Sequence, residues 1–407
     1  MTQVVGAPDA TLAVASAAHA FVAAGLGRLS GRRPLLVVTP TAAAAEQLAH
    51  DIAVFMGAEG PGQADWAGGF ADGSAGGRSG EGRAGGGRPG GPREAAARAG
   101  AKGADLDGPV ELFPAWETLP FERVSPDVAT MGRRLRLLWR LGTEGATPPE
   151  VVVAPVKALL QRLGPWRSAA RPVVVTKGER LVVDELVARL VALGYRREEI
   201  VEHRGELAVR GGIVDVFPST ADAPVRIDLW GDEVDRLTAF DVDDQRSAAD
   251  LPVAEIFGCR ELVLDEEMRA RAAALVGEEP WGRHQWERLA EGLVFDGMES
   301  WLPWLVPHEE LLVDLLADDS LVVMAEPRRV RDRAAELIDE EATLADALAA
   351  TWGADTGKPP PRLHLPFERL LASTRAHVVS LVPPGDLAAS RGADGTATIE
   401  SRGWEPI

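Results

Sequence analysis

The residue types that usually carry enzyme chemistry are few in this sequence or lack a recognisable arrangement. The single cysteine, Cys259, excludes an internal disulfide framework and a cysteine-based zinc site, and the seven histidines show no paired spacing typical of metal ligands. We expect His19, His203 and His308 to be surface or packed residues, because no serine–histidine–aspartate order includes them. The sequence therefore predicts no catalytic residue and no structural metal.

The charge balance favours a protein partner over nucleic acid. The 407 residues include 62 Asp and Glu against 43 Lys and Arg, which gives a formal net charge of −19 at pH 7. Phosphate affinity comes mainly from clustered lysine and arginine, so the surface as a whole disfavours nucleic-acid binding. No apolar run reaches the roughly 18 residues that span a bilayer, and no secretory signal is present. We expect a cytoplasmic protein without membrane contact.

The first part of the chain has the pattern of an α/β domain. Residues 12–55 predict an apolar helix, a strand at 34–38 and an Ala-rich helix. The run 34–38 has the length and branching of a parallel strand that is buried on both faces. Strand-like segments follow at 110–113 and 151–153, and the similar run 321–324 is expected to rejoin the same sheet.

Residues 57–108 interrupt this domain with a glycine-rich stretch that is poor in large apolar side chains. Such a composition cannot bury enough surface to offset the entropy lost on ordering. We therefore predict a disordered insert within the domain, whose two ends lie close together.

A smaller α+β unit is predicted in the middle of the chain. A strand at 173–175 and a helix at 179–193 precede four short strands whose residues alternate between polar and apolar, at 207–209, 213–217, 225–229 and 237–240. Two further helices are expected at 266–275 and 285–293. The predicted boundaries are 1–165 for the first part of the sheet domain, 166–252 for the small domain and 253–407 for the part that returns to the sheet.

Three stretches are longer and more particular than generic motifs. They are PAWETLPFE at 114–122, GELAVRGGIVDVFP at 205–218 and FDGMESWLP at 295–303. In this order they resemble the N-terminal part of the transcription-repair coupling factors (Mfd), and the second resembles the UvrA-binding domain that this family shares with UvrB. We expect Trp116 and Trp301, in the first and third stretches, to be packing residues, as large aromatic residues usually are.

The resemblance implies a split, helicase-like parallel-sheet domain with an inserted UvrA-binding domain and a degenerate P-loop. A working P-loop needs glycines around the phosphates, a lysine for the β and γ oxygens and a hydroxyl for Mg²⁺. Where the family pattern reads LGVTGSGKTF, residues 12–21 read LAVASAAHAF, so Ser16, His19 and Ala20 replace a glycine, the lysine and the hydroxyl residue.

The second ATPase motif of the family, DESH, aligns with residues 325–328, AEPR. Ala325 stands at the position of the metal-binding aspartate, and Glu326 follows it. We therefore expect this chain to bind no cofactor and to have no enzymatic activity.

The resemblance also implies a partner, UvrA, which would dock on the small domain through charged and polar contacts. Arginine is a favoured anchor in such interfaces because its planar guanidinium forms several hydrogen bonds and stacks on other groups. The candidate contact residues are Arg196, Arg197, Glu206, Arg210 and Phe217.

In this family the complete protein is an ATP-driven DNA translocase that displaces stalled RNA polymerase, so we expect the 407 residues to be the adaptor part of a longer protein. ATP, Mg²⁺, RNA polymerase and double-stranded DNA are expected to bind only to the domains that would follow. Two other functions stay open. A nucleic-acid-binding module conflicts with the charge of −19 and with the lack of a basic stripe interleaved with aromatic residues. An active UvrB-like ATPase would need a site that the motifs do not reveal.

Overall fold

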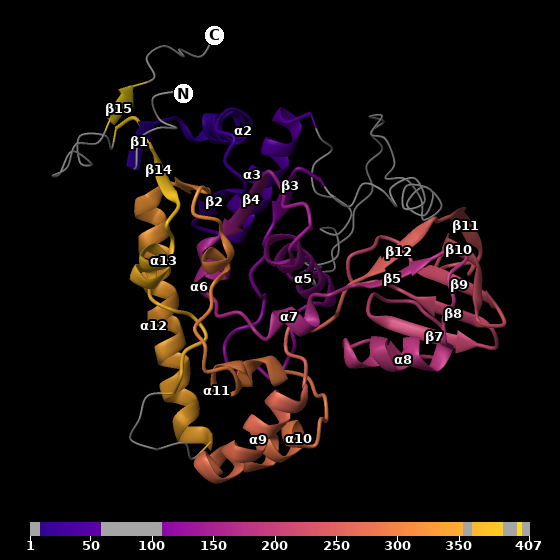
Figure 1. The fold of residues 1–407 in the computed structure, drawn as a ribbon. Helices are drawn as coiled ribbons and strands as arrows, with labels where there is room; N and C mark the ends of the chain where they lie inside the picture. Colours follow the sequence, from indigo (N-terminus) through magenta and orange to yellow (C-terminus); the bar gives the residue numbers. More distant parts are fainter. Residues whose placement is uncertain (1–8, 58–107, 353–359, 386–396, 401–407) are drawn as a thin grey trace, which may run out of the picture.

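The computed structural model describes residues 9–57, 108–352, 360–385 and 397–400. They form a parallel sheet between helices, a small domain with an antiparallel sheet, and a helical unit (Figure 1). The predicted α/β class with a separate, strand-rich domain is confirmed. The predicted glycine-rich insert lies, apart from its first and last residues, outside the described part of the chain.

The parallel sheet has seven strands in the order β15-β1-β14-β13-β2-β4-β3. Leu321 of β13 pairs with Leu35 of β2 on one side and with His377 of β14 on the other, so late segments complete a sheet that begins near the start of the chain. The strands are β1 (Asp9–Ala13), β2 (Leu35–Thr39), β3 (Val110–Leu112), β4 (Val151–Pro155), β13 (Leu321–Ala325), β14 (His377–Val382) and β15 (Ala397–Glu400).

Two apolar cores cover the two faces of this sheet. Leu35 and Val37 pack with α2 and α3, whereas Leu36 and Val38 pack with the helices on the opposite face. Burial on both faces explains why this strand is a continuous apolar run. The helices are α2 (His19–Leu29) and α3 (Ala42–Phe55) on one face, and α5 (Val128–Gly142), α6 (Val156–Leu160), α12 (Pro327–Trp352) and α13 (Phe367–Ser373) on the other.

The expected helix at the start of the chain begins later than the sequence predicts. Residues Asp9–Ala13 form strand β1, and α2 starts only at His19, after the single turn η1 (Ser16–Ala18). Strand β1 pairs with β14 and β15, which are more than 360 residues away in the sequence. Local propensity cannot reveal such pairing, because tertiary contacts decide the conformation of a short segment of mixed residues.

The small domain is built on a six-stranded sheet in the order β11-β10-β9-β8-β7-β6, with a two-stranded ribbon of β5 and β12 beside it. Strand β12 pairs with β5, so this domain continues beyond the expected end at residue 252. The elements are β5 (Val173–Thr176), α8 (Val183–Ala192), β6 (Arg196–Arg197), β7 (Glu206–Arg210), β8 (Ile213–Val216), β9 (Val225–Trp230), β10 (Glu233–Phe240), β11 (Ser247–Asp250) and β12 (Val253–Ile256).

The helical unit packs around a group of tryptophans. The indoles of Trp286 and Trp301 meet edge to face with centroids 4.7 Å apart, and Trp116 is buried in the same cluster. Both Trp116 and Trp301 are therefore packing residues, as expected. The predicted second helix ends early because the chain turns at Gly292, where φ is +78°. The elements are α9 (Glu266–Glu278), η3 (Pro280–Gly282), α10 (Arg283–Ala290), η4 (Met298–Trp301), α11 (Leu302–Leu305) and η5 (Leu312–Leu315).

None of the helices within the described ranges is long and apolar enough to cross a membrane. Over the same ranges, no three His, Cys, Asp or Glu side chains converge as the ligands of a metal ion would.

Candidate functional site

The candidate partner site lies on the face of the six-stranded sheet that is opposite α8, which we call the open face. Leu207 and Val214 point to the other face and pack against α8. Successive residues of a strand point to opposite faces, so Arg210, Asp215 and Arg226 lie on the open face. Short alternating strands thus separate an apolar side from a charged side.

Two arginines share one buried carboxylate on the open face. Arg210 donates from Nη2 to Oδ2 of Asp215 over 2.6 Å. Arg226 donates to both carboxylate oxygens over 2.7 and 3.0 Å, and this hydrogen bonding to Asp215 raises the pKa of Arg226. Asp215 is buried, whereas the Arg210 side chain remains 47% exposed. Arg210 is therefore held in place with much of its guanidinium facing solvent.

Arg196 and Arg197 both lie exposed on β6, at the edge of the sheet. Arg196 pairs with Glu206 of β7, and its Nη2 lies 3.9 Å from Oε1 of that residue on the open face. Arg197 pairs with Leu207, whose side chain points to the α8 side. The predicted arginine pair is thus divided between two faces, and only Arg196 shares a face with Arg210.

Glu206 is buried and holds a turn. Its Oε2 accepts hydrogen bonds from the backbone N–H groups of Glu202 and His203, both over 2.8 Å. Burial alone would raise the pKa of Glu206, but these two N–H groups and the charges of His203 and Arg196 lower it below its ordinary value. Glu206 therefore positions the chain that leads to the open face.

Phe217 is also buried, so it does not offer an aromatic contact to a partner as the sequence suggested. It packs with Val201, Ala208 and Phe240 in a small cluster on the open-face side. The Arg204 guanidinium lies 5.5 Å from the centre of its ring. Phe217 supports the open face from within.

The base of the small domain is fixed by hydrogen bonds around a buried tyrosine. The hydroxyl of Tyr195 donates to the carbonyl of Phe257 over 2.7 Å and accepts from the backbone N–H of Ser219 over 3.1 Å. Helix α5 approaches so closely here that a Cβ on Gly132 would lie 2.4 Å from Oγ of Ser219. These contacts fix the small domain against the parallel-sheet unit.

Cys259 lies in the same buried region, and burial raises the pKa of its thiol to about 12. The thiolate is the reactive form of cysteine, so the native thiol should react very slowly with a disulfide reagent at about pH 8. We expect complete labelling only after unfolding in denaturant, where the pKa returns to about 8.5. The colour yield of an aromatic disulfide reagent measures this, and fast stoichiometric labelling of the folded chain would contradict it.

A buried ion pair joins the end of the small domain to α5. Arg134 and Glu261 are both fully buried; Nε of the arginine donates to Oε1 of the carboxylate, and Nη2 lies 3.3 Å from Oε2. Glu261 also accepts from the indole N–H of Trp116 over 3.1 Å. Arg134 donates to the carbonyl of Pro114 and lies over the Phe113 ring, 4.2 Å from its centre. The polar atoms of this pair are therefore well satisfied.

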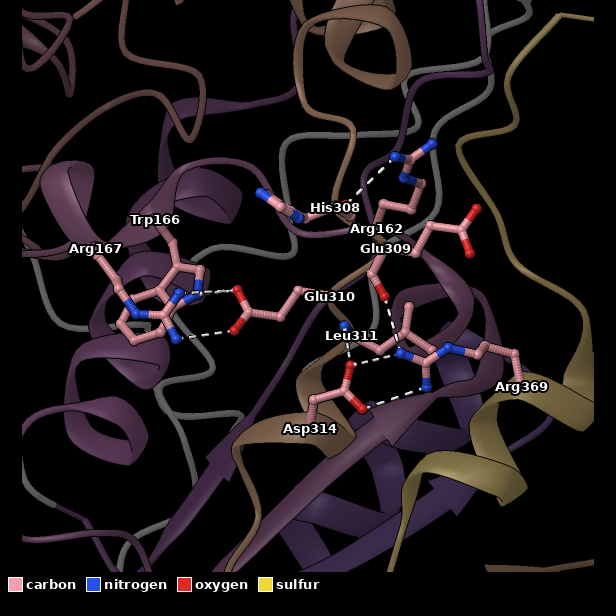
Figure 2. A network of polar contacts seen from close by, with 9 residues as sticks. All are labelled: Arg162, Trp166, Arg167, His308, Glu309, Glu310, Leu311, Asp314 and Arg369. Carbon is pink, nitrogen blue, oxygen red and sulfur yellow. Dashed lines mark hydrogen bonds and ion pairs between the residues drawn. The ribbon is translucent and has the colours of Figure 1, made fainter. Parts of the chain in front are cut away.

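A second, more exposed network holds the segment that links the helical unit to the sheet (Figure 2). Figure 2 shows Trp166 and Arg167 directed at Glu310, which accepts from the indole N–H over 3.0 Å and from the guanidinium over 2.9 and 3.1 Å. Arg162 is buried and donates to the carbonyl of Val306 over 2.6 Å. Arg369 binds Asp314 and the carbonyl of Glu309.

The two degenerate nucleotide motifs meet at the carboxyl ends of strands β1 and β13. Oγ of Ser16 donates to Oε1 of Glu326 over 3.2 Å, while Arg329 donates to the other oxygen over 2.5 Å. His19 is buried at the start of α2, and burial lowers its pKa against the opposing charge of Glu326. Ala20 and Ala325 are buried and apolar. A neutral imidazole and a carboxylate thus stand where phosphate binding would need cations.

We expect no specific binding of Mg-ATP at this place. The region has lost the lysine, Glu326 would repel phosphate oxygens, and the lowered pKa keeps His19 neutral at pH 7. Calorimetry should detect no saturable heat at micromolar ATP. One-site binding at micromolar ATP that disappears in His19→Ala would contradict this prediction.

Sequence reasoning overlooked Arg226 as the main partner of Asp215, although a charged residue two positions from each strand end was a usable signal. It also overlooked Trp230, whose side chain is 84% exposed. A tryptophan at the end of a strand is more often packed, so its residue type alone gave no indication of exposure.

Comparison with known proteins matches the small domain to one family. Residues 173–261 match the UvrB interaction domain, which covers β5 to β12 and the open face. The transcription-repair-coupling factor of Mycobacterium tuberculosis is 43% identical over 259 residues, which are 60% of this chain and 21% of that protein. Those of Haemophilus influenzae and Escherichia coli are 33% identical over 52% of the chain and 32% identical over 46% of it.

The chain spans about a fifth of the length of these relatives, which corresponds to 19% of the Haemophilus protein and 17% of the Escherichia protein. The matched domain lies where the sequence placed the partner site, and the relatives carry the name that the three sequence stretches had suggested. The chain is therefore related to the N-terminal, UvrB-like module of the transcription-repair-coupling factors, and residues 173–261 are its UvrB interaction domain.

Proposed function

We propose that this chain is a non-catalytic adaptor that binds UvrA through the open face of its small domain. The observation that carries the proposal is the position of Arg210 and Arg196, which stand exposed on the open face of a UvrB interaction domain. In a longer protein of this family, the adaptor would recruit UvrA to lesions at which RNA polymerase has stalled. The ATP-driven movement on double-stranded DNA that displaces the polymerase would belong to other domains.

The charge pattern of the open face supports a protein partner over nucleic acid. Arg210 and Arg226 share Asp215, Arg236 pairs with Asp250, and Arg196 lies beside Glu206. Nucleic-acid surfaces instead collect lysine and arginine along the path of the phosphates. Alternating charges are better suited to the complementary charges of a protein surface.

The proposal is tested by equilibrium binding of purified UvrA to the 407-residue chain, compared with the variants Arg210→Ala and Arg189→Ala. Arg189 is an exposed arginine of α8, on the opposite side of the domain, and donates a hydrogen bond to the carbonyl of Pro172. It is a matched control because both residues are exposed and each has one hydrogen-bonded partner residue. Loss of affinity in Arg210→Ala alone supports the open face, and equal loss in both variants argues against it.

A further inference from the structure

Trp230 is the most exposed large apolar side chain within the described ranges, with 84% of its surface open to solvent. It is the last residue of β9, at a hairpin that continues through Gly231 and Asp232 into β10. Burying an indole side chain removes a large apolar area from water, and tryptophan is enriched among the residues that dominate protein interfaces. An indole that the fold leaves almost uncovered is therefore a strong candidate for a partner contact.

The hairpin that carries Trp230 is held on both sides. The N–H of Leu229 donates to the carbonyl of Gly212 over 2.8 Å, and the N–H of Leu181 donates to the carbonyl of Asp232 over 2.7 Å. The adjacent turn is Gly211–Gly212, which has no side chains that could cover the indole. A rigid support reduces the entropy lost on binding, so the exposed indole is already positioned for contact.

Strand register places Trp230 on the same face as Arg210. Arg210 pairs with Ile213, and Ile213 pairs with Asp228 of β9. Trp230 follows Asp228 by two residues and therefore points to the same side of the sheet. Two strand spacings and two residue rises put the Cα atoms of Arg210 and Trp230 about 12 Å apart. One protein interface, which buries about 800 Å² on each partner, readily covers both.

The hairpin also has a distinct charge. Asp232, Glu233 and Asp235 are exposed around the tip, and Glu233 is paired directly with Trp230 in the strand register. An apolar ring surrounded by carboxylates fits an apolar pocket whose rim carries lysine or arginine. This differs from the part of the open face around Asp215, where arginines predominate.

We propose that Trp230 is the apolar anchor of the UvrA-binding surface and that it enters an apolar pocket on UvrA with a basic rim. This inference rests on the proposed function and adds to it a second contact, at the hairpin end of the open face. Arg210 supplies directional hydrogen bonds, and Trp230 supplies the buried apolar area. The acidic tip orients the approach of the two proteins.

The test is the affinity of purified UvrA for the wild-type chain, Trp230→Ala, Trp230→Phe and Val191→Ala. Val191 is an exposed apolar residue of α8, on the opposite side of the domain, and serves as the control. We expect Trp230→Ala to weaken binding at least tenfold, Trp230→Phe to keep most of the affinity and Val191→Ala to match wild type. Thermal melts should be unchanged, because the side chain makes little contact within the chain.

A further variant tests the basic rim. Asp232→Lys combined with Glu233→Lys should slow association several-fold at low salt, and the difference should shrink as salt is added. Wild-type binding with unchanged affinity in Trp230→Ala would overturn the role of Trp230 and leave the proposed function standing. Absence of binding by the wild-type chain would overturn both proposals together.

Discussion

Glu261→Ala is expected to lower the free energy of unfolding by about 3–5 kcal/mol, because it leaves the Arg134 charge buried without its partner. Both side chains are fully buried, and the same substitution removes the acceptor of the Trp116 indole N–H. The position also joins the end of the UvrB interaction domain to α5. Denaturation in urea, followed by circular dichroism, measures this change.

Glu310→Ala is a closely matched control for this prediction. Glu310 likewise accepts from one arginine, Arg167, and from one indole, that of Trp166 (Figure 2). The Arg167 side chain, however, is 66% exposed, so solvent screens the pair and it contributes about 1 kcal/mol or less. Equal destabilisation by the two alanine substitutions would show that burial does not govern these pairs and would contradict our account of the junction.

Replacing both members of the buried pair gives a further check. Apolar residues of similar volume often substitute for a buried ion pair with little loss of stability, because neither charge then has to be taken out of water. Arg134→Met combined with Glu261→Leu should therefore be more stable than Glu261→Ala alone. A double variant less stable than the single one would show that the hydrogen bonds to Pro114 and Trp116 matter more than the unpaired charge.

Arg210→Ala is expected to weaken UvrA binding by about 2 kcal/mol, which is about thirtyfold in the dissociation constant. The guanidinium is held by Asp215 yet half exposed, so a partner can bind its remaining N–H groups without first ordering the side chain. Folding should barely change, because Asp215 keeps its two hydrogen bonds from Arg226.

Arg210→Lys distinguishes hydrogen-bond geometry from charge at this position. Lysine keeps the positive charge but lacks the planar fork, so we expect only part of the affinity to return. If Arg210 merely attracted the partner from a distance, the lysine variant would match wild type and the alanine variant would alter mainly the association rate. Rate constants measured at two salt concentrations separate these outcomes.

The parts of the fold that depend on local patterns could be predicted from the sequence. The run at residues 34–38 indicated a strand buried on both faces, and the alternation in 207–229 indicated the short strands of the small domain. Strand β1 could not be predicted, because residues 9–13 become a strand only through pairing with β14 and β15. The two-residue strand β6 is too short for any periodicity.

The candidate site was predictable by residue type and less so by orientation. Arg210 lies exposed as a contact residue should, whereas Glu206 and Phe217 are buried, because a strand sequence does not reveal how loops cover one of its faces. Arg196 and Arg197 were treated as a pair, although adjacent residues of a strand must point in opposite directions. Trp230 was overlooked because its exposure depends on the neighbouring glycine turn.

The most direct test of the adaptor function is an equilibrium titration of the 407-residue chain with purified UvrA, without nucleotide and at physiological salt. We predict saturable binding by the wild-type chain that falls about thirtyfold in Arg210→Ala and is unchanged in Arg189→Ala. Circular dichroism melts of the three proteins should coincide. No saturable binding by the folded wild-type chain, or equal affinity in all three proteins, would contradict the assignment of the open face as the UvrA site.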